Sequence, residues 1–282
     1  MPLANGRTLA LGDRTLVMGI VNVTPDSFSD GGVLVDPARA VDAAVHMVDA
    51  GADILDVGGE STRPGAEPLD EAEERRRVLP VIEALAARVS VPLSIDTYKA
   101  TIADAAMQAG ATIINDISGL RYDPALGAVA AKHGAGLVLM HTRGRSRDMY
   151  QHATYHDVVD EVLDELRESI TFATRAGVAR ERLLLDPGLG FAKHAAHSYE
   201  ALGRLEEFGE LGRPLVVGAS RKGFLTKALG REIPAVQRDW ATAAAVAASV
   251  LAGAHIVRVH AVGEMVHVVR VADEIRKYHR GE

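Results

Sequence analysis

Eight short apolar runs recur along the 282-residue chain, and they constrain its fold more than any other feature. Successive runs begin roughly 20 to 45 residues apart. Most of them are almost continuously apolar, which is typical of parallel strands buried on both faces. The expected strands are Leu16–Val23, Ile54–Gly59, Leu93–Thr97, Ile113–Ser118, Gly136–Thr142, Leu183–Gly188, Leu215–Ser220 and Ile256–His260.

Helical segments fill the gaps between these runs. Asp36 precedes a proline, which makes an N-cap and first-turn pair, and Asp70 begins an acidic first turn. Gly110, Gly177 and Gly253 stand where helices would end, and glycine suits a C-terminal cap. The expected helices are Pro37–Ala50, Asp70–Arg88, Ala100–Ala109, Asp157–Ala176 and Ala235–Ala252.

The alternation of strands and helices indicates the fold class. It is compatible with an open doubly wound sheet or with a closed barrel, and the count of eight strands favours an α/β fold of the (β/α)8 TIM-barrel type. Residues 1–13 form a short N-terminal extension, which we expect to fold as a hairpin over the bottom of the barrel. No linker or low-complexity tract interrupts the sequence, so we predict a single domain spanning residues 1–282.

Composition argues against several other classes of protein. The formal net charge is −7 and no long basic run occurs, which speaks against nucleic-acid binding. The chain has no cysteine, which excludes disulfides and thiolate metal sites. No apolar run of about 18 residues or signal peptide is evident, and the scattered histidines do not form a zinc pattern. We therefore expect a cytoplasmic protein that binds neither nucleic acid nor membrane.

Polar residues collect at the C-terminal ends of the expected strands. A single polar residue there usually caps the next helix or binds a loop. In a barrel, however, all these ends meet at the face where active sites form, so eight polar ends predict one shared pocket. The residues are Asn22, Glu60, Ser61, Thr62, Arg63, Asp96, Thr97, Asn115, Asp116, His141, Asp186, Ser220, Arg221, Lys222, Arg258 and His260.

The chemistry of these groups divides them into two sets. One set combines groups that are cationic or can become so with an amide oxygen suited to Mg²⁺, and thus suits a polyanion such as pyrophosphate; its members are Asn22, Arg63, Lys222, Arg258 and His260. The other set can read the N–H edge of a flat heterocycle; its members are Asp96, Asn115 and Asp186. Neither GxGxxG nor GxxxxGK[ST] is present, so a Rossmann or P-loop site is not supported.

Eight motifs distributed over the whole chain resemble those of dihydropteroate synthases. They are MGIVNVTPDSFSDGG (Met18–Gly32), GADILDVGGESTRPGA (Gly51–Ala66), SIDT (Ser94–Thr97), NDISG (Asn115–Gly119), LMH (Leu139–His141), LDPGLGFAK (Leu185–Lys193), GASRKGF (Gly218–Phe224) and VRVH (Val257–His260). The resemblance implies a transferase of folate biosynthesis, which condenses 6-hydroxymethyl-7,8-dihydropterin pyrophosphate with 4-aminobenzoate and releases 7,8-dihydropteroate and pyrophosphate. It also implies Mg²⁺ as cofactor, a homodimer and a sulfonamide target.

The same resemblance implies a role for individual residues. The residues implied for pyrophosphate are Asn22, Thr62, Arg63, Arg258 and His260, with Asn22 as the Mg²⁺ ligand. Those implied for the pterin are Asp96, Asn115, Asp186 and Lys222, and those for 4-aminobenzoate are Phe28, Thr62, Pro64, Phe191, Lys222 and Gly223. The expected catalytic residues are Asp96, Lys222 and Arg63. Asp96 would stabilise the cation formed when the pterin C–O bond breaks, while Arg63 would stabilise the departing pyrophosphate.

Two departures from the family pattern support one alternative function. Gly223 stands where relatives often have a small hydroxyl residue, and Ala261 stands in place of an acidic residue. A non-catalytic pterin-binding relative is therefore one alternative, which a turnover measurement would separate from the synthase. The pterin-binding barrel of corrinoid-linked methyltransferases is another, but such barrels lack the SRK and TPDSFSDGG segments present in this chain.

Overall fold

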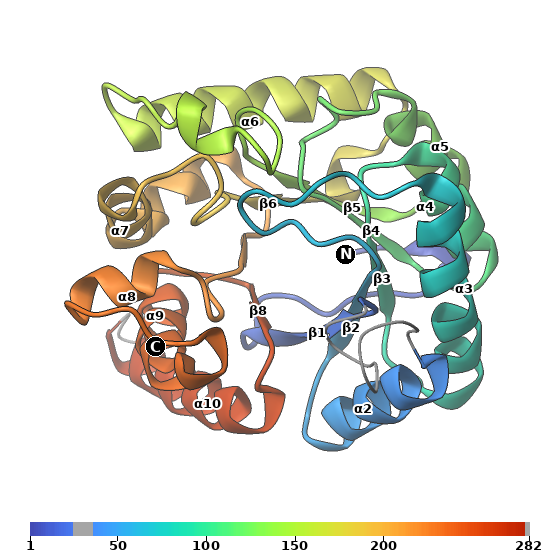
Figure 1. The fold of residues 1–282 in the computed structure, drawn as a ribbon, viewed down its shortest axis with the longest axis horizontal. Coiled ribbons are helices and arrows are strands. Elements are labelled where there is room, and N and C mark those ends of the chain that lie inside the picture. Colours follow the sequence, from blue (N-terminus) through green and yellow to red (C-terminus); the bar gives the residue numbers. More distant parts are fainter. Residues whose placement is uncertain (25–35, 280–282) are drawn as a thin grey trace.

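The computed structural model describes residues 1–24 and 36–279 and contains a closed parallel barrel (Figure 1). Eight strands in these ranges pair in the order β6-β5-β4-β3-β2-β1-β8-β7. A parallel bridge between Leu185 and Leu215 joins the two ends of that order and closes the sheet. The strands are β1 (Leu16–Asn22), β2 (Ile54–Gly58), β3 (Leu93–Asp96), β4 (Ile113–Asp116), β5 (Gly136–Met140), β6 (Leu183–Asp186), β7 (Val216–Val217) and β8 (Ile256–Val259). The predicted (β/α)8 barrel is confirmed.

Helices follow the strands and form a ring around them (Figure 1). The carboxylates of Asp36, Asp70 and Asp157 accept hydrogen bonds from first-turn amides of α2, α3 and α6. Gly110 and Gly177 follow the ends of α4 and α6 with φ values of 117° and 95°, which favour glycine. The helices are α2 (Pro37–Asp49), α3 (Glu71–Arg88), α4 (Ala100–Gln108), α5 (Ala125–His133), α6 (Val158–Arg175), α7 (Ala195–Gly203), α8 (Phe224–Ala228), α9 (Asp239–Leu251) and α10 (Val262–His279).

The alanine-rich helix begins later than the sequence predicts. Ala235–Gln237 forms a separate 3-10 turn, and α9 starts at Asp239. Arg238 interrupts the helix with φ −90° and ψ 11°. Its guanidinium donates to the carbonyls of Ile233 and Arg221, each at 2.9 Å. These bonds hold the start of α9 against the segment that follows β7.

Side chains along the strands alternate between two cores, as the two-residue period of a strand requires. In β1, Met18 lies in the inner cluster, whereas Val17 and Val21 belong to the outer core between strands and helices. In β2, Ile54 faces inward and Leu55 outward. The inner cluster consists of Leu3, Leu9, Leu16, Met18, Ile54, Ile113, Val138, Leu184, Val216 and Ile256.

The N-terminal segment covers the bottom of the barrel. Pro2 and Thr8 form an antiparallel bridge, and the Met1 ammonium donates to the Leu9 carbonyl at 2.7 Å. Leu3 and Leu9 pack into the inner cluster, and the N-terminus lies within the ring in projection (Figure 1). This confirms the predicted hairpin and leaves the polar ends of the strands at the opposite mouth.

Within the described ranges, none of the helices α2 to α10 is both long and apolar enough to cross a bilayer.

Candidate functional site

Strand register brings three of the predicted polar residues into one row with Gly58 at the C-terminal mouth. Asn22 pairs with Gly58, Gly58 with Asp96, and Asp96 with Asn115. A Cβ added to Gly58 would lie 3.3 Å from the Asp96 Cβ, so glycine leaves room for the carboxylate beside it. The row therefore depends on β1 to β4 together.

Arg258 of β8 joins the carboxylates from two other strands. Its Nε donates to Asp56 Oδ2 and its Nη2 to Asp96 Oδ2, each at 2.6 Å. Asn115 Nδ2 donates to the same Asp56 oxygen at 2.9 Å. Arg258 Nη1 has no hydrogen-bond partner within the described chain, so it retains donors for a ligand.

Asp56 is a site residue that the sequence analysis missed. Its side chain is fully buried, and its Oδ1 has no hydrogen-bond partner among residues 1–24 and 36–279. The available signal was the two-residue period of β2, which places Asp56 on the inward face with Ile54 and Gly58. An inward carboxylate in a barrel needs a cation, and Arg258 supplies it.

Asp96 has an altered acidity because of its surroundings. Burial raises the pKa of Asp96 to about 7, the Arg258 guanidinium opposes that shift, and the charges of Asp56, Glu74 and Glu60 add to it. A carboxyl group that titrates near neutral pH in a barrel mouth is characteristic of a functional site.

A second group of predicted residues gathers around Gly218, beyond β7. A Cβ at Gly218 would lie 3.8 Å from Lys222 Nζ and 3.9 Å from Asp186 Oδ2. Lys222 Nζ donates to the Leu189 carbonyl at 2.5 Å and lies 4.4 Å from the centre of the Phe191 ring. Burial lowers the pKa of Lys222 to about 8, against the opposing effect of Asp186, and burial raises the pKa of Asp186.

His260 lies beside this group, after β8. Its Nδ1 is 2.9 Å from Ser220 Oγ, and the Ser220 oxygen also accepts from the His260 amide at 3.2 Å. Burial, followed by the charge of Arg258, lowers the pKa of His260 to about 3, so its ring is neutral at pH 7. The charge of Arg63 contributes to the same shift. A neutral ring bonded to a hydroxyl at Nδ1 offers its Nε2–H to a ligand.

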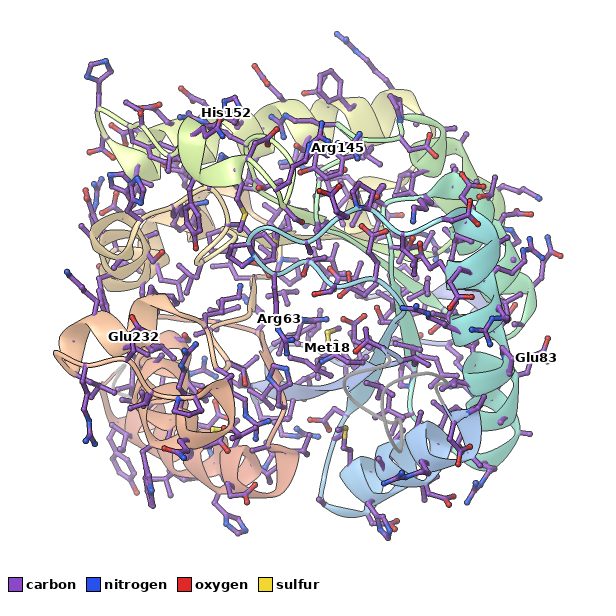
Figure 2. The ribbon with its side chains drawn as sticks, in the orientation of Figure 1. Met18, Arg63, Glu83, Arg145, His152 and Glu232 are labelled. Carbon is purple, nitrogen blue, oxygen red and sulfur yellow. The ribbon has the colours of Figure 1, made fainter. Side chains whose placement is uncertain are left out.

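The segment after β2 carries three of the predicted residues over the mouth. Thr62 is half-buried, whereas Arg63 and Pro64 are exposed. Figure 2 shows Arg63 in projection over the centre of the barrel, near Met18 of the inner cluster. The Gly65 amide donates to the Ser146 carbonyl at 2.9 Å, which links this segment to the one after β5.

A buried ion cluster anchors the base of that segment. Lys99 Nζ donates to Glu60 Oε2 at 2.6 Å, to Glu74 Oε2 at 2.5 Å and to the Leu69 carbonyl at 2.6 Å. Tyr98 donates to Glu60 Oε1 at 3.1 Å. Both ends of residues 60–69 are therefore fixed, while Arg63 at the middle makes no ion pair with any described residue.

Asn22 is the remaining candidate for a metal. It ends β1 at the mouth and is half-buried, and no hydrogen bond engages its side chain within the described part of the molecule. The same part contains no cluster of three or more His, Cys, Asp or Glu side chains that could hold a metal. A lone amide oxygen fits Mg²⁺, which usually retains waters and binds a substrate phosphate besides one or two protein ligands.

The predicted site residues are thus mostly neighbours. The structure brings together Asp96, Asn115 and Arg258 in one group, and Asp186, Lys222 and Phe191 in another. Gly223 begins the turn into α8, and its amide donates to no acceptor in the described chain. Phe28 lies outside the described residues, so its predicted role stays a prediction.

Comparison with known proteins identifies the family. A family profile described as "Pterin binding enzyme" matches residues 18–260. The dihydropteroate synthase of Synechocystis sp. is 45% identical over 97% of this chain and 95% of its own. That of Bacillus subtilis is 44% identical over 94% of this chain and 90% of its own.

Solved structures agree with these relatives. The Yersinia pestis dihydropteroate synthase with a sulfonamide drug has a TM-score of 0.91 and 43% identity, covering 97% of this chain and 98% of its own. The Xanthomonas albilineans enzyme with 4-aminobenzoic acid has a TM-score of 0.90 and 44% identity, covering 98% of both chains. The resemblance deduced from the motifs is confirmed, and the chain belongs to the pterin-binding enzyme family as a dihydropteroate synthase.

Proposed function

We propose that the barrel mouth condenses 6-hydroxymethyl-7,8-dihydropterin pyrophosphate with 4-aminobenzoate, giving 7,8-dihydropteroate and pyrophosphate. Membership of the dihydropteroate synthases makes the chain a transferase of this kind. A related Xanthomonas albilineans structure is described as a complex with 7,8-dihydropteroate, at 41% identity and a TM-score of 0.87. The observation that carries the proposal is the convergence of Asp96, Asn115, Asp186 and Lys222 at one mouth.

The pterin would bind deepest, against the inward ends of β3, β4 and β6. Asp186 and Asn115 are buried and present a carboxylate and an amide, which match the N–H and carbonyl edge of a pterin. Lys222 would donate to the pterin carbonyl in place of, or together with, its bond to Leu189. The low exposure of these groups strengthens each bond and makes a mismatch costly.

Pyrophosphate would bind toward the mouth, between β1, β8 and the segment after β2. Arg63 has no ion-pair partner in the described chain, Arg258 keeps Nη1 free, and His260 offers Nε2–H. Asn22 and the pyrophosphate would hold Mg²⁺, which when bound supplies charge neutralisation to the leaving group. The sequence placed His260 among groups that are cationic or can become so, and its lowered pKa favours the neutral hydrogen-bond donor.

The reaction breaks the C–O bond between the pterin methylene and pyrophosphate. Positive charge develops on the methylene carbon and spreads into the pterin ring, while the bonding electrons leave with pyrophosphate. The Asp96 carboxylate, 2.6 Å from Arg258, would stabilise that cation. The neutral amine of 4-aminobenzoate then forms the C–N bond and loses a proton to solvent, so no strong base is needed.

The 4-aminobenzoate pocket would lie between the segments after β2, β6 and β7. Phe191 offers a ring beside Lys222, Thr62 and Pro64 lie on the opposite segment, and the free amide of Gly223 can donate to the carboxylate. That amide replaces the hydroxyl that relatives often carry. Because the Yersinia pestis relative is described with a sulfonamide drug, we propose that sulfonamides compete for this pocket.

A homodimer is the assembly that the surface favours. Helices α9 and α10 pack together, and both expose large apolar side chains that a partner subunit could cover. They are Trp240, Leu251, Val271, Ile275 and Tyr278, with exposures from 41% to 90%. Light scattering would give twice the chain mass, and Trp240→Lys would reduce it. Cytoplasmic location and a single domain over residues 1–282 stay predictions.

Turnover separates this proposal from the non-catalytic alternative that Gly223 and Ala261 support. Purified protein mixed with the dihydropterin pyrophosphate, Mg²⁺ and 4-aminobenzoate should release pyrophosphate and form dihydropteroate in equal amounts. Binding of the pterin without release would favour the non-catalytic relative. The corrinoid methyltransferase alternative is not supported by the relatives found, which are dihydropteroate synthases over nearly the full chain.

A further inference from the structure

Lys193, in the segment between β6 and α7, is buried although it carries an amine. Lys193 is 1% exposed and is among the largest fully buried side chains of the described chain. Burying a lysine is costly unless its amine is well bonded. Lys193 Nζ contacts His141 Nδ1 at 2.8 Å and donates to the carbonyls of Gly188 and Phe191 at 3.2 Å each.

Those two carbonyls belong to the turn that also contacts Lys222. The carbonyl of Leu189 accepts from Lys222 Nζ at 2.5 Å, and the Phe191 ring lies 4.4 Å from the same nitrogen. Lys193 therefore binds the carbonyls of Gly188 and Phe191, while Lys222 binds the carbonyl of Leu189 in the same turn. Residues 188–191 thus contact both amines.

The turn has a backbone that few side chains could adopt. Gly188 and Gly190 have φ values of 70° and 78°, and Ala192 has 47°. A Cβ on Gly188 would lie 1.9 Å from the His141 carbonyl, so the turn packs directly on the end of β5. Because its glycines have wide conformational freedom, the turn needs external bonds to hold it in one conformation.

His141 connects Lys193 to a fixed helix. Because its Nδ1 accepts from Lys193, its proton lies on Nε2, which faces Glu165 Oε2 at 3.2 Å. The Nε2 contact is close, although its angle is not that of a hydrogen bond. Arg143 pairs with Glu165 in turn. A chain of contacts therefore links Glu165 of α6 through His141 and Lys193 to the turn.

Several charged groups face Lys193 across this buried region. Burial lowers the pKa of Lys193 to about 7; the Asp186 carboxylate opposes the shift and the charge of Lys222 adds to it. The other groups are Glu165 and Arg143, with His141 in direct contact. The ammonium form has three N–H donors, one for His141 Nδ1 and one for each carbonyl, whereas the neutral amine keeps two, which suffice for the two carbonyls.

We propose that Lys193 is a positioning residue for the condensation: it holds the 188–191 turn so that the Leu189 carbonyl and the Phe191 ring fix Lys222 in the pterin pocket. The inference rests on the proposed function, because the position of Lys222 affects kcat only if the protein catalyses the condensation. Lys193 itself does not touch the substrate in this arrangement. Its loss should therefore act through Lys222.

A double-mutant cycle tests this route. Lys193→Met, Lys222→Met and the double variant would be compared for kcat and for KM of both substrates. Lys193→Met should lower kcat by about 10²-fold, since misplacement of a pocket group by about 1 Å can cost that much. In the Lys222→Met background the same change should cost less than about threefold, because the residue that the turn positions is already gone.

Lys193→Gln separates hydrogen bonding from charge and from folding. Both variants remove the charge, but glutamine keeps N–H donors for the turn, so Lys193→Gln should recover at least about tenfold of the lost kcat. Lys193→Gln should fold even if Lys193→Met does not, and it would then replace Lys193→Met in the double-mutant cycle. Lys132→Met, at an exposed position of α5, is the control and should have the kcat and KM of the parent.

The outcomes distinguish this inference from the proposed function. If the parent releases no pyrophosphate, the proposed function fails and the inference fails with it. If the parent is active but the two losses multiply independently, or Lys193→Met keeps parental kcat, the positioning role is overturned while the proposed function stands. Equal kcat of Lys193→Gln and Lys193→Met would also overturn it.

Discussion

Asp56→Asn perturbs the buried centre of the site while preserving its shape. Asp56 Oδ2 accepts from Arg258 Nε at 2.6 Å and from Asn115 Nδ2 at 2.9 Å. The remaining Oδ1 is buried without a partner in the described chain. An asparagine can direct its oxygen to the same two donors and place its amide where Oδ1 stands, so the charge is what changes.

The expected cost follows from that difference. A hydrogen bond to a charged group contributes about 1.5–3 kcal/mol, and a neutral one about 0.5–1.5 kcal/mol. The position of Oδ1 lacks a partner before and after the change, so its cost nearly cancels. We expect Asp56→Asn to lower the free energy of unfolding by about 1–3 kcal/mol. The melting temperature should fall by about 2–4 °C for each kcal/mol.

Activity should change through Arg258, which loses one of its two carboxylate partners. A tenfold fall in kcat/KM corresponds to about 1.4 kcal/mol of lost transition-state stabilisation, and we expect about this loss. Denaturant unfolding and steady-state kinetics measure the two effects. Asp164→Asn, an exposed ion-pair residue of α6, is the control and should change stability by about 0.5 kcal/mol or less. Parental stability and kinetics for Asp56→Asn would refute the reasoning.

Three further predictions concern the pocket directly. The kcat/KM profile should rise with pH as Asp96 ionises near 7 and fall as Lys222 loses its proton near 8. Asp96→Asn should abolish the rising limb and lower kcat by about 10²-fold. If the rising limb were unchanged in this variant, it would belong to another group. Asp186→Ala should cost about 2–4 kcal/mol of pterin affinity by calorimetry, from loss of a charge-assisted bidentate contact; equal affinity would mean that the pterin is read elsewhere. Pyrophosphate, Mg²⁺ and a pterin should tighten 4-aminobenzoate binding, and Arg63→Ala should weaken that coupling more than it weakens pterin binding; tight 4-aminobenzoate binding to the bare protein would exclude loop closure.

The barrel could be predicted because each of its strands has a recognisable local sequence pattern. Runs such as Gly136–Met140 are apolar on both faces, and helix caps such as Asp70 and Gly177 mark the gaps between the strands. The start of α9 could not be placed in this way. It depends on Arg238 bonding to the carbonyl of Arg221, a contact between segments that no local pattern encodes.

The same distinction applies to the site. Asp96 and Asp186 end their strands, so position alone marked them as candidates. Asp56 lies within an apolar strand, and its role appears only when β8 brings Arg258 across the barrel. The neutral state of His260 likewise arises from burial and from the charges of three arginines, Arg258, Arg221 and Arg63, which only the assembled mouth brings together.

The barrel mouth should perform a condensation rather than bind a pterin alone. The most direct measurement follows pyrophosphate release and dihydropteroate formation in one sample containing the parent protein, dihydropterin pyrophosphate, Mg²⁺ and 4-aminobenzoate. We expect both products in a one-to-one ratio, dependence on 4-aminobenzoate, and a rate reduced by about 10²-fold in Asp96→Asn. Pterin binding with no release of pyrophosphate above that of the protein-free control would contradict it.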